Sequence, residues 1–461
     1  MPPSRPGAIF PRRTKPDAPL QADRALAQVT DARRAAADLC ADLRRGELLD
    51  PAFETHAAAL DARDRRWLQE LTYGMLRRRA ALDARLSPRV TGGFARLDPD
   101  VVDLLRLGAY QLLQMRSVPP YAAIAQTVEL VKTRHGIGAS RLANAVLRRL
   151  DRERDAAEPA PADPVEALAL AHSHPRWLVA RWISRWGAEE TARLLASNDR
   201  EPPTVLRAFG VVPEQLEAML ESAGVATHHH ALVPGSLEVV GGPALTETGA
   251  YRQGHFFVQD PGATLVTRYA AIPAGAAVAD VCAAPGGKTL ELARTARAVV
   301  ACDRSTSRIA RLAQNIARVD AKNVHSVVAD ARHPAVANVD AVLIDAPCTG
   351  TGTLRRHPDA RWRLKPSDLA VMGALQRALL RAAAPAVRTG GLLIYSTCSL
   401  EPEENDAQVE SFLADQKGAF ALEPPPEGAV DSSALDAGRL RVLPQRHGAD
   451  GAFAARLRRI A

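Results

Sequence analysis

Two cysteines in polar loops are the residues of this sequence best suited to covalent chemistry. Cys348 lies in DAPCTGTG and Cys398 lies in YSTCS, and each stretch follows an apolar run that predicts a strand. Most cysteines are small buried apolar groups, and this interpretation suits Cys40 and Cys302. It suits Cys348 and Cys398 poorly, because glycine, threonine and serine surround them. Both are therefore candidates for a reactive thiolate.

A glycine-rich turn in ADVCAAPGGKT, residues 279–289, predicts a site for a nucleotide-like ligand. Its apolar start predicts a buried strand, and KTLELA predicts the first turns of a helix. Glycines let the backbone approach a ligand, and the start of a helix offers free N–H groups. A P-loop for a nucleoside triphosphate is disfavoured, although GGKT and DAVLIDA look like its two motifs. That pattern requires glycine where Cys282 stands, and Pro285 removes an N–H group from the phosphate loop.

Three aspartates follow the next three predicted strands. Asp303 suits hydrogen bonds from ribose hydroxyls, Asp330 suits the adenine or its ribose edge, and Asp345 ends the fourth strand. Three carboxylates would repel a triphosphate but suit an adenosine that carries a positively charged sulfonium. The pattern therefore indicates S-adenosylmethionine as the cofactor.

A methyl donor beside a thiol indicates methylation at carbon 5 of a pyrimidine. A thiolate that adds to carbon 6 turns the ring into an enamine, whose carbon 5 can attack the methyl group. Asp345 is a candidate to hydrogen-bond the base edge around N3. A base within a duplex cannot reach such a site, so we expect an unpaired or flipped base. The chemistry alone does not decide which cysteine is the nucleophile.

The elements that position these residues alternate between strands and helices from residue 276 onward. The predicted strands are AVADVCA, AVVACD, NVHSVVAD, DAVLIDAP and GLLIYSTC, and helices are predicted over 308–319 and 368–387. This alternation is typical of a parallel, doubly wound sheet covered on both faces. Ligands of such sheets lie beyond the carboxyl ends of the strands. The fourth and fifth strands would be neighbours, so we expect both thiols to face one cleft.

The N-terminal part is predicted to be helical, and a mixed segment follows it. Apolar residues recur at helical spacing from residue 23 to about 151, and 153–164 is an aperiodic run rich in alanine, proline and aspartate. In the mixed segment, PRWLVARWISRWG predicts a helix whose tryptophans pack on one face, and PTVLRAF and SLEVVGG predict strands. The tract His228, His229 and His230 is expected to be a solvated loop, since three adjacent ligands rarely converge on one metal ion. The predicted boundaries are a disordered basic tail over 1–22, a helical domain over 23–152, a linker over 153–165, a small α+β segment over 166–257 and an α/β domain over 258–461.

Composition favours a nucleic-acid partner and a reducing compartment. The formal net charge is +7 and the pI about 9.4, which fits a polyanionic partner. The five cysteines form no C-x-x-C pair, which disfavours disulfides and zinc sites and favours the cytoplasm. No uncharged apolar run is long enough for a membrane span, and the first residues do not look like a secretory signal.

Long stretches of the sequence resemble one known family. ADVCAAPGGKT, DAPCTGTGTLRRHPDARW and YSTCSLEPEEN look like the Sun/NOL1/NOP2 family of RNA (cytosine-5)-methyltransferases, and residues 103–150 resemble the NusB-type helical RNA-binding domain. The combination is similar to the bacterial 16S rRNA branch of that family. The resemblance implies a multidomain protein with an all-α NusB-like domain and a Rossmann-like class I methyltransferase domain. It also implies 16S rRNA as the partner, with no DNA or membrane involved, and we expect a monomer.

The resemblance also implies roles for individual residues. It makes Cys398 the nucleophile and gives Cys348 a part in product release. It assigns S-adenosylmethionine binding to the turn and to three aspartates: Cys282, Ala283, Ala284, Pro285, Gly286, Gly287, Lys288, Asp303, Asp330 and Asp345. Ala329 and Ala331 flank Asp330 where the family often has glycine, which departs from its loop pattern. Arg355, Arg356 and His357 of RRHPDARW suit either phosphate contacts or a packed loop.

Two other classes of protein compete with this interpretation. A non-catalytic RNA-binding scaffold would have no use for two thiols in polar loops. A DNA cytosine methyltransferase would be expected to carry a large insert between Cys348 and Cys398, and the sequence has none there. A related tRNA specificity remains open at this point.

Overall fold

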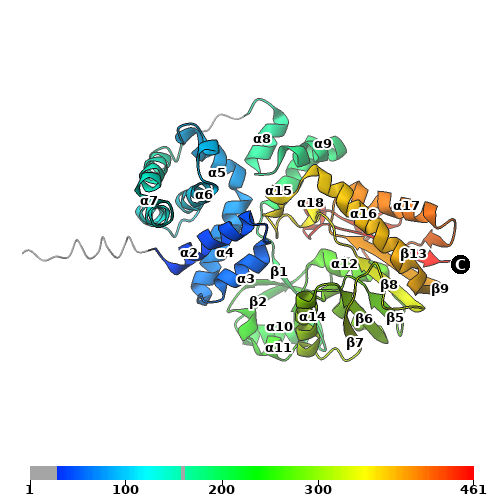
Figure 1. Cartoon of the computed structure of the whole chain (residues 1–461). Helices are drawn as coiled ribbons and strands as arrows, with labels where there is room; N and C mark the ends of the chain where they lie inside the picture. Colours follow the sequence, from blue (N-terminus) through cyan, green and yellow to red (C-terminus); the bar gives the residue numbers. More distant parts are fainter. Residues whose placement is uncertain (1–28, 157–160) are drawn as a thin grey trace, which may run out of the picture. The chain divides into compact units, whose positions relative to one another are not determined.

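The computed structural model describes residues 29–156 and 161–461. Met1–Ala160 and Pro161–Ala461 form two compact units (Figure 1). The predicted tail over 1–22 and part of the predicted linker lie outside the described residues, and the domain boundaries given above remain predictions. No helix of the described residues is long and apolar enough to cross a membrane.

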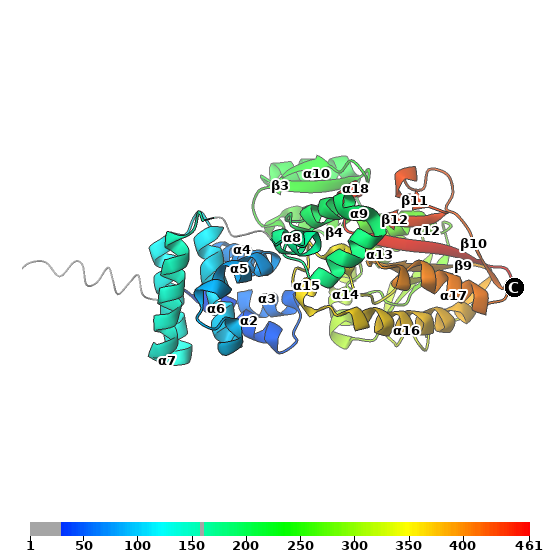
Figure 2. The same cartoon turned by 90° about the horizontal axis from the view of Figure 1, so that it is seen from above.

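The first unit is helical in every described element, as its periodicity predicts. Its helices are α2 (Asp31–Arg44), α3 (Leu49–Ala57), α4 (Ala62–Arg77), α5 (Arg79–Leu86), α6 (Pro99–Leu113) and α7 (Pro120–Arg152). Helix α6 is the centre of this unit, because most of its residues are buried, and α7 lies beside it (Figure 2). Two glycines allow close packing. A Cβ at Gly74 would lie 1.9 Å from the Tyr110 hydroxyl, and one at Gly108 would lie 2.9 Å from Thr127 Oγ1.

The second unit begins with two helices and a small antiparallel sheet. The elements are α8 (Pro164–Ala171), α9 (Arg176–Asn198), β1 (Thr204–Ala208), α10 (Pro213–Ser222), β2 (Ala226–His229), β3 (Ser236–Gly241), α11 (Gly249–Arg252) and β4 (Phe256–Val258). The strand order is β2-β3-β1-β4. Leu206, Leu216, Leu220, Leu237 and Phe256 form its core. The helix and strands predicted for this segment are confirmed.

The expectation of a loop at the histidine tract was wrong. His228 and His229 belong to β2, with side chains 56% and 49% exposed. Histidine is compatible with an edge strand of this kind, because β2 pairs only with β3 and leaves its side chains in solvent. The described residues hold no cluster of three His, Cys, Asp or Glu that could bind a metal ion.

A large sheet forms the rest of the second unit. Its five parallel strands are β5 (Ala277–Asp280), β6 (Ala298–Asp303), β7 (Val324–Val328), β8 (Val339–Asp345) and β9 (Val387–Thr397). Their order, β9-β8-β5-β6-β7, confirms the predicted parallel core and the neighbouring positions of the fourth and fifth predicted strands. The connecting helices are α12 (Pro261–Ala270), α13 (Gly287–Ala293), α14 (Thr306–Arg318), α15 (Ala360–Arg363), α16 (Pro366–Ala383) and α17 (Asp406–Asp415).

The C-terminal residues extend this sheet with antiparallel strands that the sequence did not predict. Strand β13 (Ala452–Arg459) pairs antiparallel with β9, and β12 (Arg439–Val442) and β11 (Leu435–Asp436) follow outward from it. Strand β10 (Phe420–Leu422) pairs antiparallel with the last residues of β13. A four-residue helix, α18 (Pro444–His447), precedes β13. The large sheet is therefore mixed, with its parallel half carrying the predicted motifs.

Alternate strand residues enter the two cores on either side of the large sheet. Val278, Leu343 and Ile394 pack with residues of α12, α13 and α14. Val342 and Leu393 pack on the opposite face with α16 and α17, which lie side by side in Figure 2. Covering both faces leaves the carboxyl ends of the parallel strands as the place where loops can form a site.

Candidate active site

The glycine-rich turn lies between β5 and α13, at the carboxyl edge of the parallel strands. Gly286 has a φ of +111°, and a Cβ there would come within 2.4 Å of Leu312 Cδ1 on α14. The turn is anchored to its neighbour, since Ala283 N donates to the Cys302 carbonyl at 2.8 Å. Both the backbone conformation and the packing therefore require glycine at position 286.

The aspartates predicted for the cofactor lie at the ends of adjacent strands. Asp303 is buried at the end of β6 and accepts from Ser305 N at 3.0 Å, with the Arg308 guanidinium 3.2 Å away. Asp345 ends β8 and binds Lys288 Nζ at 2.8 Å. Asp330 lies two residues beyond β7.

Each of these carboxylates has a cation beside it. The Arg332 guanidinium donates to the Asp330 carboxylate at 2.6 Å, and this bond holds the pKa of Asp330 well below its usual range. Arg308 forms an ion pair with Asp303, and Lys288 forms one with Asp345. The strand edge is consequently closer to neutral than three unpaired carboxylates would make it, which weakens the charge argument against a phosphate ligand.

The two thiols predicted to share a cleft are in contact. Cys348 follows β8 by three residues, Cys398 directly follows β9, and their sulfurs are 3.3 Å apart. Both residues are partly exposed. Asp345 lies on the same side, because Ser396 Oγ of β9 donates to its Oδ1 at 2.9 Å. The structure thus brings together Cys348, Cys398, Asp345 and Lys288.

A buried carboxylate, Glu404, ties the two thiol loops to each other. It is fully buried and accepts from Thr349 N at 2.9 Å and from the Thr349 hydroxyl. Ser399 Oγ and Gln376 Nε2 donate to it at 2.5 and 3.1 Å. Since Thr349 follows Cys348 and Ser399 follows Cys398, one side chain fixes the neighbours of both thiols. Sequence reasoning missed this residue, and its only signal was the unexplained acidic pair in SLEPEEN.

The electrostatic environment distinguishes the two thiols. The hydrogen bond with Cys398, together with burial, raises the pKa of Cys348 well above its usual range. Burial lowers the pKa of Lys288, but the Asp345 carboxylate and the charge of a Cys398 thiolate outweigh it, so the pKa is raised overall. Lys288 therefore stays cationic close to Cys398, while Cys348 stays a neutral thiol that can donate a hydrogen bond.

The third cysteine near the site, Cys282, is not suited to act as a nucleophile. Burial and the surrounding carboxylates Asp280, Asp345 and Asp303 raise the pKa of its thiol far above neutral pH. Asp280 is itself fully buried beneath the turn and accepts from Thr289 Oγ1 at 2.7 Å. Burial raises the pKa of Asp280 to about 7. The sequence did not indicate the raised pKa of Asp280, because the residue lies within a predicted strand.

The C-terminal stretch GADG packs directly on the Cys348 loop. Gly451 N donates to the Gly352 carbonyl at 2.8 Å, and Gly352 N donates to the Cys398 carbonyl at 2.9 Å. A Cβ at Gly352 would lie 2.6 Å from the Cys398 carbonyl oxygen and 2.7 Å from the Gly451 Cα. Three backbone segments meet here more closely than any side chain would allow.

The arginines of RRHPDARW are used for packing. Arg355 binds Asp450 at 2.6 Å and Asp260 at 3.1 Å, and Arg356 binds Asp260 at 2.6 Å and also contacts Asp450. Arg355 is buried and both carboxylates are buried with it. Of the two alternatives for these arginines, the structure favours the packed loop, because their guanidinium groups already neutralise two buried carboxylates.

The tryptophan helix α9 braces the loop that follows Cys398. Trp182 is fully buried and its indole Nε1 donates to Glu401 at 3.0 Å. Arg181 also binds Glu401, and Trp177 and Trp186 pack at the edge of the same core. The prediction that these tryptophans serve helix packing is confirmed.

Three families match successive parts of the chain. NusB family matches residues 30–152, the ferredoxin-like domain of RsmF/B-like methyltransferases matches 174–245, and 16S rRNA methyltransferase RsmB/F matches 271–458. The NusB-like helical domain, the small α+β segment and the Rossmann-like domain expected from the sequence are thereby confirmed.

Curated relatives match over nearly their whole length. A probable ribosomal RNA small subunit methyltransferase B of Synechocystis sp. is 34% identical over 89% of this chain and 94% of its own. The ribosomal RNA small subunit methyltransferase B of Sodalis glossinidius is 33% identical over 95% and 96%. Among solved structures, PH0851 matches with a TM-score of 0.79 and 27% identity over 94% of this chain and 99% of its own. NSun6 from Pyrococcus horikoshii with SFG shares the fold over 62% of this chain and 98% of its own, with a TM-score of 0.55 and 22% identity.

Proposed function

The chain belongs to the ribosomal RNA small subunit methyltransferase B family, and from this membership we propose that it forms 5-methylcytosine in 16S rRNA by covalent catalysis. The observation that carries the proposal is the pair of thiols 3.3 Å apart in the loops after β8 and β9. A scaffold protein has no need for two cysteines held in contact at the open edge of a sheet.

The residues at the strand edge fit S-adenosylmethionine as the cofactor. Gly286 gives the turn its positive φ where a Cβ would contact Leu312, and Asp303 offers carboxylate oxygens at the end of β6. Cys282, Ala283, Ala284, Pro285, Gly287, Lys288, Asp330 and Asp345 complete the proposed binding set. When bound, the cofactor supplies an electrophilic methyl group. The residues of the turn position it, and Asp303 accepts hydrogen bonds from the ribose.

Cys398 is the proposed nucleophile, and the cation Lys288 interacts with it. Lys288, held by Asp345 at 2.8 Å, interacts electrostatically with a thiolate at Cys398. The thiolate forms a bond to carbon 6 of the cytosine, and the ring electrons move to carbon 5, which then takes the methyl group. Asp345 is proposed to orient the base at its edge around N3, where the exocyclic N4 amino group of cytosine can donate a hydrogen bond to the carboxylate.

Cys348 is proposed to act in release of the product. After methyl transfer, carbon 5 loses its proton, the C5–C6 double bond forms again and the bond from Cys398 to carbon 6 breaks. The neutral Cys348 thiol, 3.3 Å from the Cys398 sulfur, can donate a hydrogen bond to the departing thiolate. Without that donor, the covalent intermediate should persist.

The helical unit is proposed to contribute RNA affinity. Arg141, Arg148 and Arg152 are exposed on α7, at spacings of seven and four residues that place them on one face of the helix. Such a basic face favours phosphate contacts, whose number sets the salt dependence of binding. Replacing Arg148 by glutamate should therefore lower both the affinity for rRNA and the slope of its salt dependence, with cofactor affinity unchanged. Equal salt slopes for the variant and the wild type would show that α7 does not contact phosphate.

Transfer of labelled methyl groups to protein-free 16S rRNA, with tRNA and DNA in parallel, tests the function. The proposal predicts label on 16S rRNA, recovered as 5-methylcytosine after digestion, and none on DNA. Label recovered at another atom or base would overturn the carbon-5 chemistry. Label on tRNA alone would overturn the substrate. Retained cofactor binding with no transfer to RNA or to ribosomal particles would favour the scaffold alternative.

A further inference from the structure

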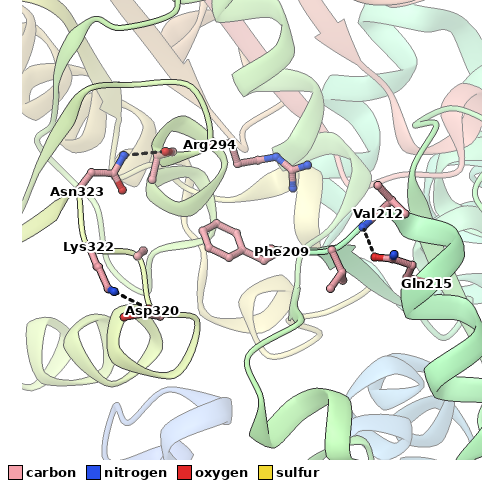
Figure 3. A pocket seen from close by; sticks show the side chains of 11 residues that line it. Phe209, Val212, Gln215, Arg294, Asp320, Lys322 and Asn323 are labelled. Carbon is pink, nitrogen blue, oxygen red and sulfur yellow. Dashed lines mark hydrogen bonds and ion pairs between the residues drawn. The ribbon is translucent and has the colours of Figure 1, made fainter.

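A groove on the second unit lies apart from the thiols and has no part in the chemistry above. Its volume is about 710 Å³, within the range of small-molecule sites. Residues 209–212, Gln215, Ala293, Arg294 and residues 320–323 line it (Figure 3). Arg294 Nη1 donates to the carbonyl of Ala208, the residue before Phe209, at 2.6 Å. The groove thus lies where the small α+β segment meets the large sheet.

The groove opens at the end of the large sheet opposite to the candidate active site. Residues 293–294 precede β6, which begins at Ala298, and residues 320–323 precede β7, which begins at Val324. The glycine-rich turn and both thiols lie beyond the carboxyl ends of the strands. A strand of six residues such as β6 is about 20 Å long. A single nucleotide therefore cannot occupy both places, whereas a longer RNA can.

An aromatic ring, Phe209, lies between two cations in this groove, Arg294 and Lys322 (Figure 3). Phe209 is half-buried, and its ring stands edge-on to Phe257 with centroids 6.2 Å apart, which restricts its motion. Figure 3 shows this ring in the middle of the groove, between the lysine and asparagine on one side and the start of α10 on the other. Arg294 and Lys322 have side chains 39% and 83% exposed.

Positive charge is in excess beside the groove. Arg207 binds Glu291 at 2.8 Å, Arg294 lies 4.0 Å from the same carboxylate, and Arg268 interacts electrostatically with all three. Three guanidinium groups thus share one carboxylate. Lys322 has Asp320 3.3 Å away, but both side chains are more than two-thirds exposed, and an exposed pair of this kind is weak enough for phosphate to replace the carboxylate.

We propose that this groove is a second contact site for single-stranded RNA, with a base stacked on Phe209 and the phosphates on either side of that base at Arg294 and Lys322. A positive groove that offers aromatic surface is the arrangement by which proteins hold single strands without reading their sequence. The inference rests on the proposed function for its RNA, and it adds a contact about 20 Å from the reacting base. Long substrates should therefore use the groove, and short ones should not.

The test compares three variants of the full chain on two lengths of RNA. Lys322→Glu reverses one groove charge, and Phe209→Leu removes the ring but keeps an apolar side chain against Phe257. Lys417→Glu is the matched control, since Lys417 is an exposed lysine two residues after the end of α17 and does not line the groove. The RNAs are 16S rRNA and the shortest of its fragments that still accepts methyl groups from the wild type.

Both groove variants should bind 16S rRNA at least about fivefold more weakly, the lower end expected for one lost stacking contact. Lys322→Glu should also lower the salt slope by about 0.7, the share of one single-strand phosphate. KM for 16S rRNA should rise with kcat unchanged, and KM for the short fragment should not change. If both groove variants match Lys417→Glu on 16S rRNA, the groove is not an RNA site. If the effect occurs only on protein-containing ribosomal particles, the occupant is a protein and the proposal is wrong. Absence of methyl transfer by the wild type would instead refute the proposed function.

Discussion

Replacing Glu404 by glutamine isolates the role of the carboxylate that joins the two thiol loops. One of its oxygens accepts from two fixed N–H groups, Thr349 N at 2.9 Å and Gln376 Nε2 at 3.1 Å. The other accepts from the Thr349 and Ser399 hydroxyls. Because hydroxyls can rotate and accept, a glutamine NH₂ group can replace the second oxygen while the first remains an acceptor. The substitution therefore removes the charge and keeps the connectivity.

The expected cost follows from the difference between charged and neutral hydrogen bonds. A hydrogen bond to a charged group contributes about 1.5–3 kcal/mol and a neutral one about 0.5–1.5 kcal/mol. Part of that difference is offset, because a buried carboxylate is costly to desolvate. We expect Glu404→Gln to lower the free energy of unfolding by about 1–3 kcal/mol. Glu404→Ala leaves the two N–H donors unpaired in the core and should cost about 3–5 kcal/mol.

The pKa of Cys348 gives a second readout, which a loss of folding stability alone would not change. The negative charge of Glu404 is among the causes that raise the pKa of Cys348. Removing that charge in Glu404→Gln should lower this pKa, so alkylation of Cys348 should begin at a lower pH. The assay is iodoacetamide labelling across pH in a Cys398→Ser background, with the modified peptide identified by mass spectrometry. An unchanged pH midpoint together with an unchanged kcat would refute the role assigned to Glu404.

Three further perturbations have defined outcomes. Burial raises the pKa of Asp280 to about 7, so the contribution of this group to stability is present below about pH 4 and is lost as pH rises through 7. In urea unfolding, Asp280→Asn should raise the free energy of unfolding over wild type by up to about 4 kcal/mol at pH 8 and by little at pH 4. An equal increase at both pH values would contradict the assignment. Lys288→Met removes the cation that interacts with Cys398 and should lower kcat by about tenfold or more, equivalent to about 1.4 kcal/mol of transition-state stabilisation, whereas an unchanged kcat would exclude Lys288 from that task. Trp182→Phe should cost about 1.5–3 kcal/mol in urea unfolding through the lost hydrogen bond to buried Glu401, and a cost no larger than that of the partly exposed Trp177→Phe would argue against it.

The parallel half of the large sheet was predictable because each of its strands is a short, continuous apolar segment. Runs such as DAVLIDAP are buried on both faces, so they read as continuous apolar segments bounded by polar loops. The positions of Cys348, Cys398 and Asp345 then followed from strand order alone, since parallel strands present their carboxyl ends at one edge.

For related reasons, neither strand β13 nor the role of Glu404 was predictable from the sequence. Arg456 is buried in β13, where Glu423 and the Ala270 carbonyl accept its hydrogen bonds, and neither partner is near it in sequence. Glu404 likewise acts through Thr349, which is distant along the chain. Buried charge is recognisable only with its partners in place, so local pattern gives no signal for either.

Trapping the covalent intermediate in Cys348→Ala tests the central claim most directly. Without its thiol, release should fail, and the protein should remain joined to 16S rRNA on a denaturing gel in the presence of S-adenosylmethionine. Nuclease digestion should then leave a methylated cytosine mass on the peptide that contains Cys398, and the double variant Cys348→Ala, Cys398→Ala should give no adduct. An adduct that persists in the double variant, or free RNA with wild-type turnover in Cys348→Ala, would contradict the covalent roles assigned to these two thiols.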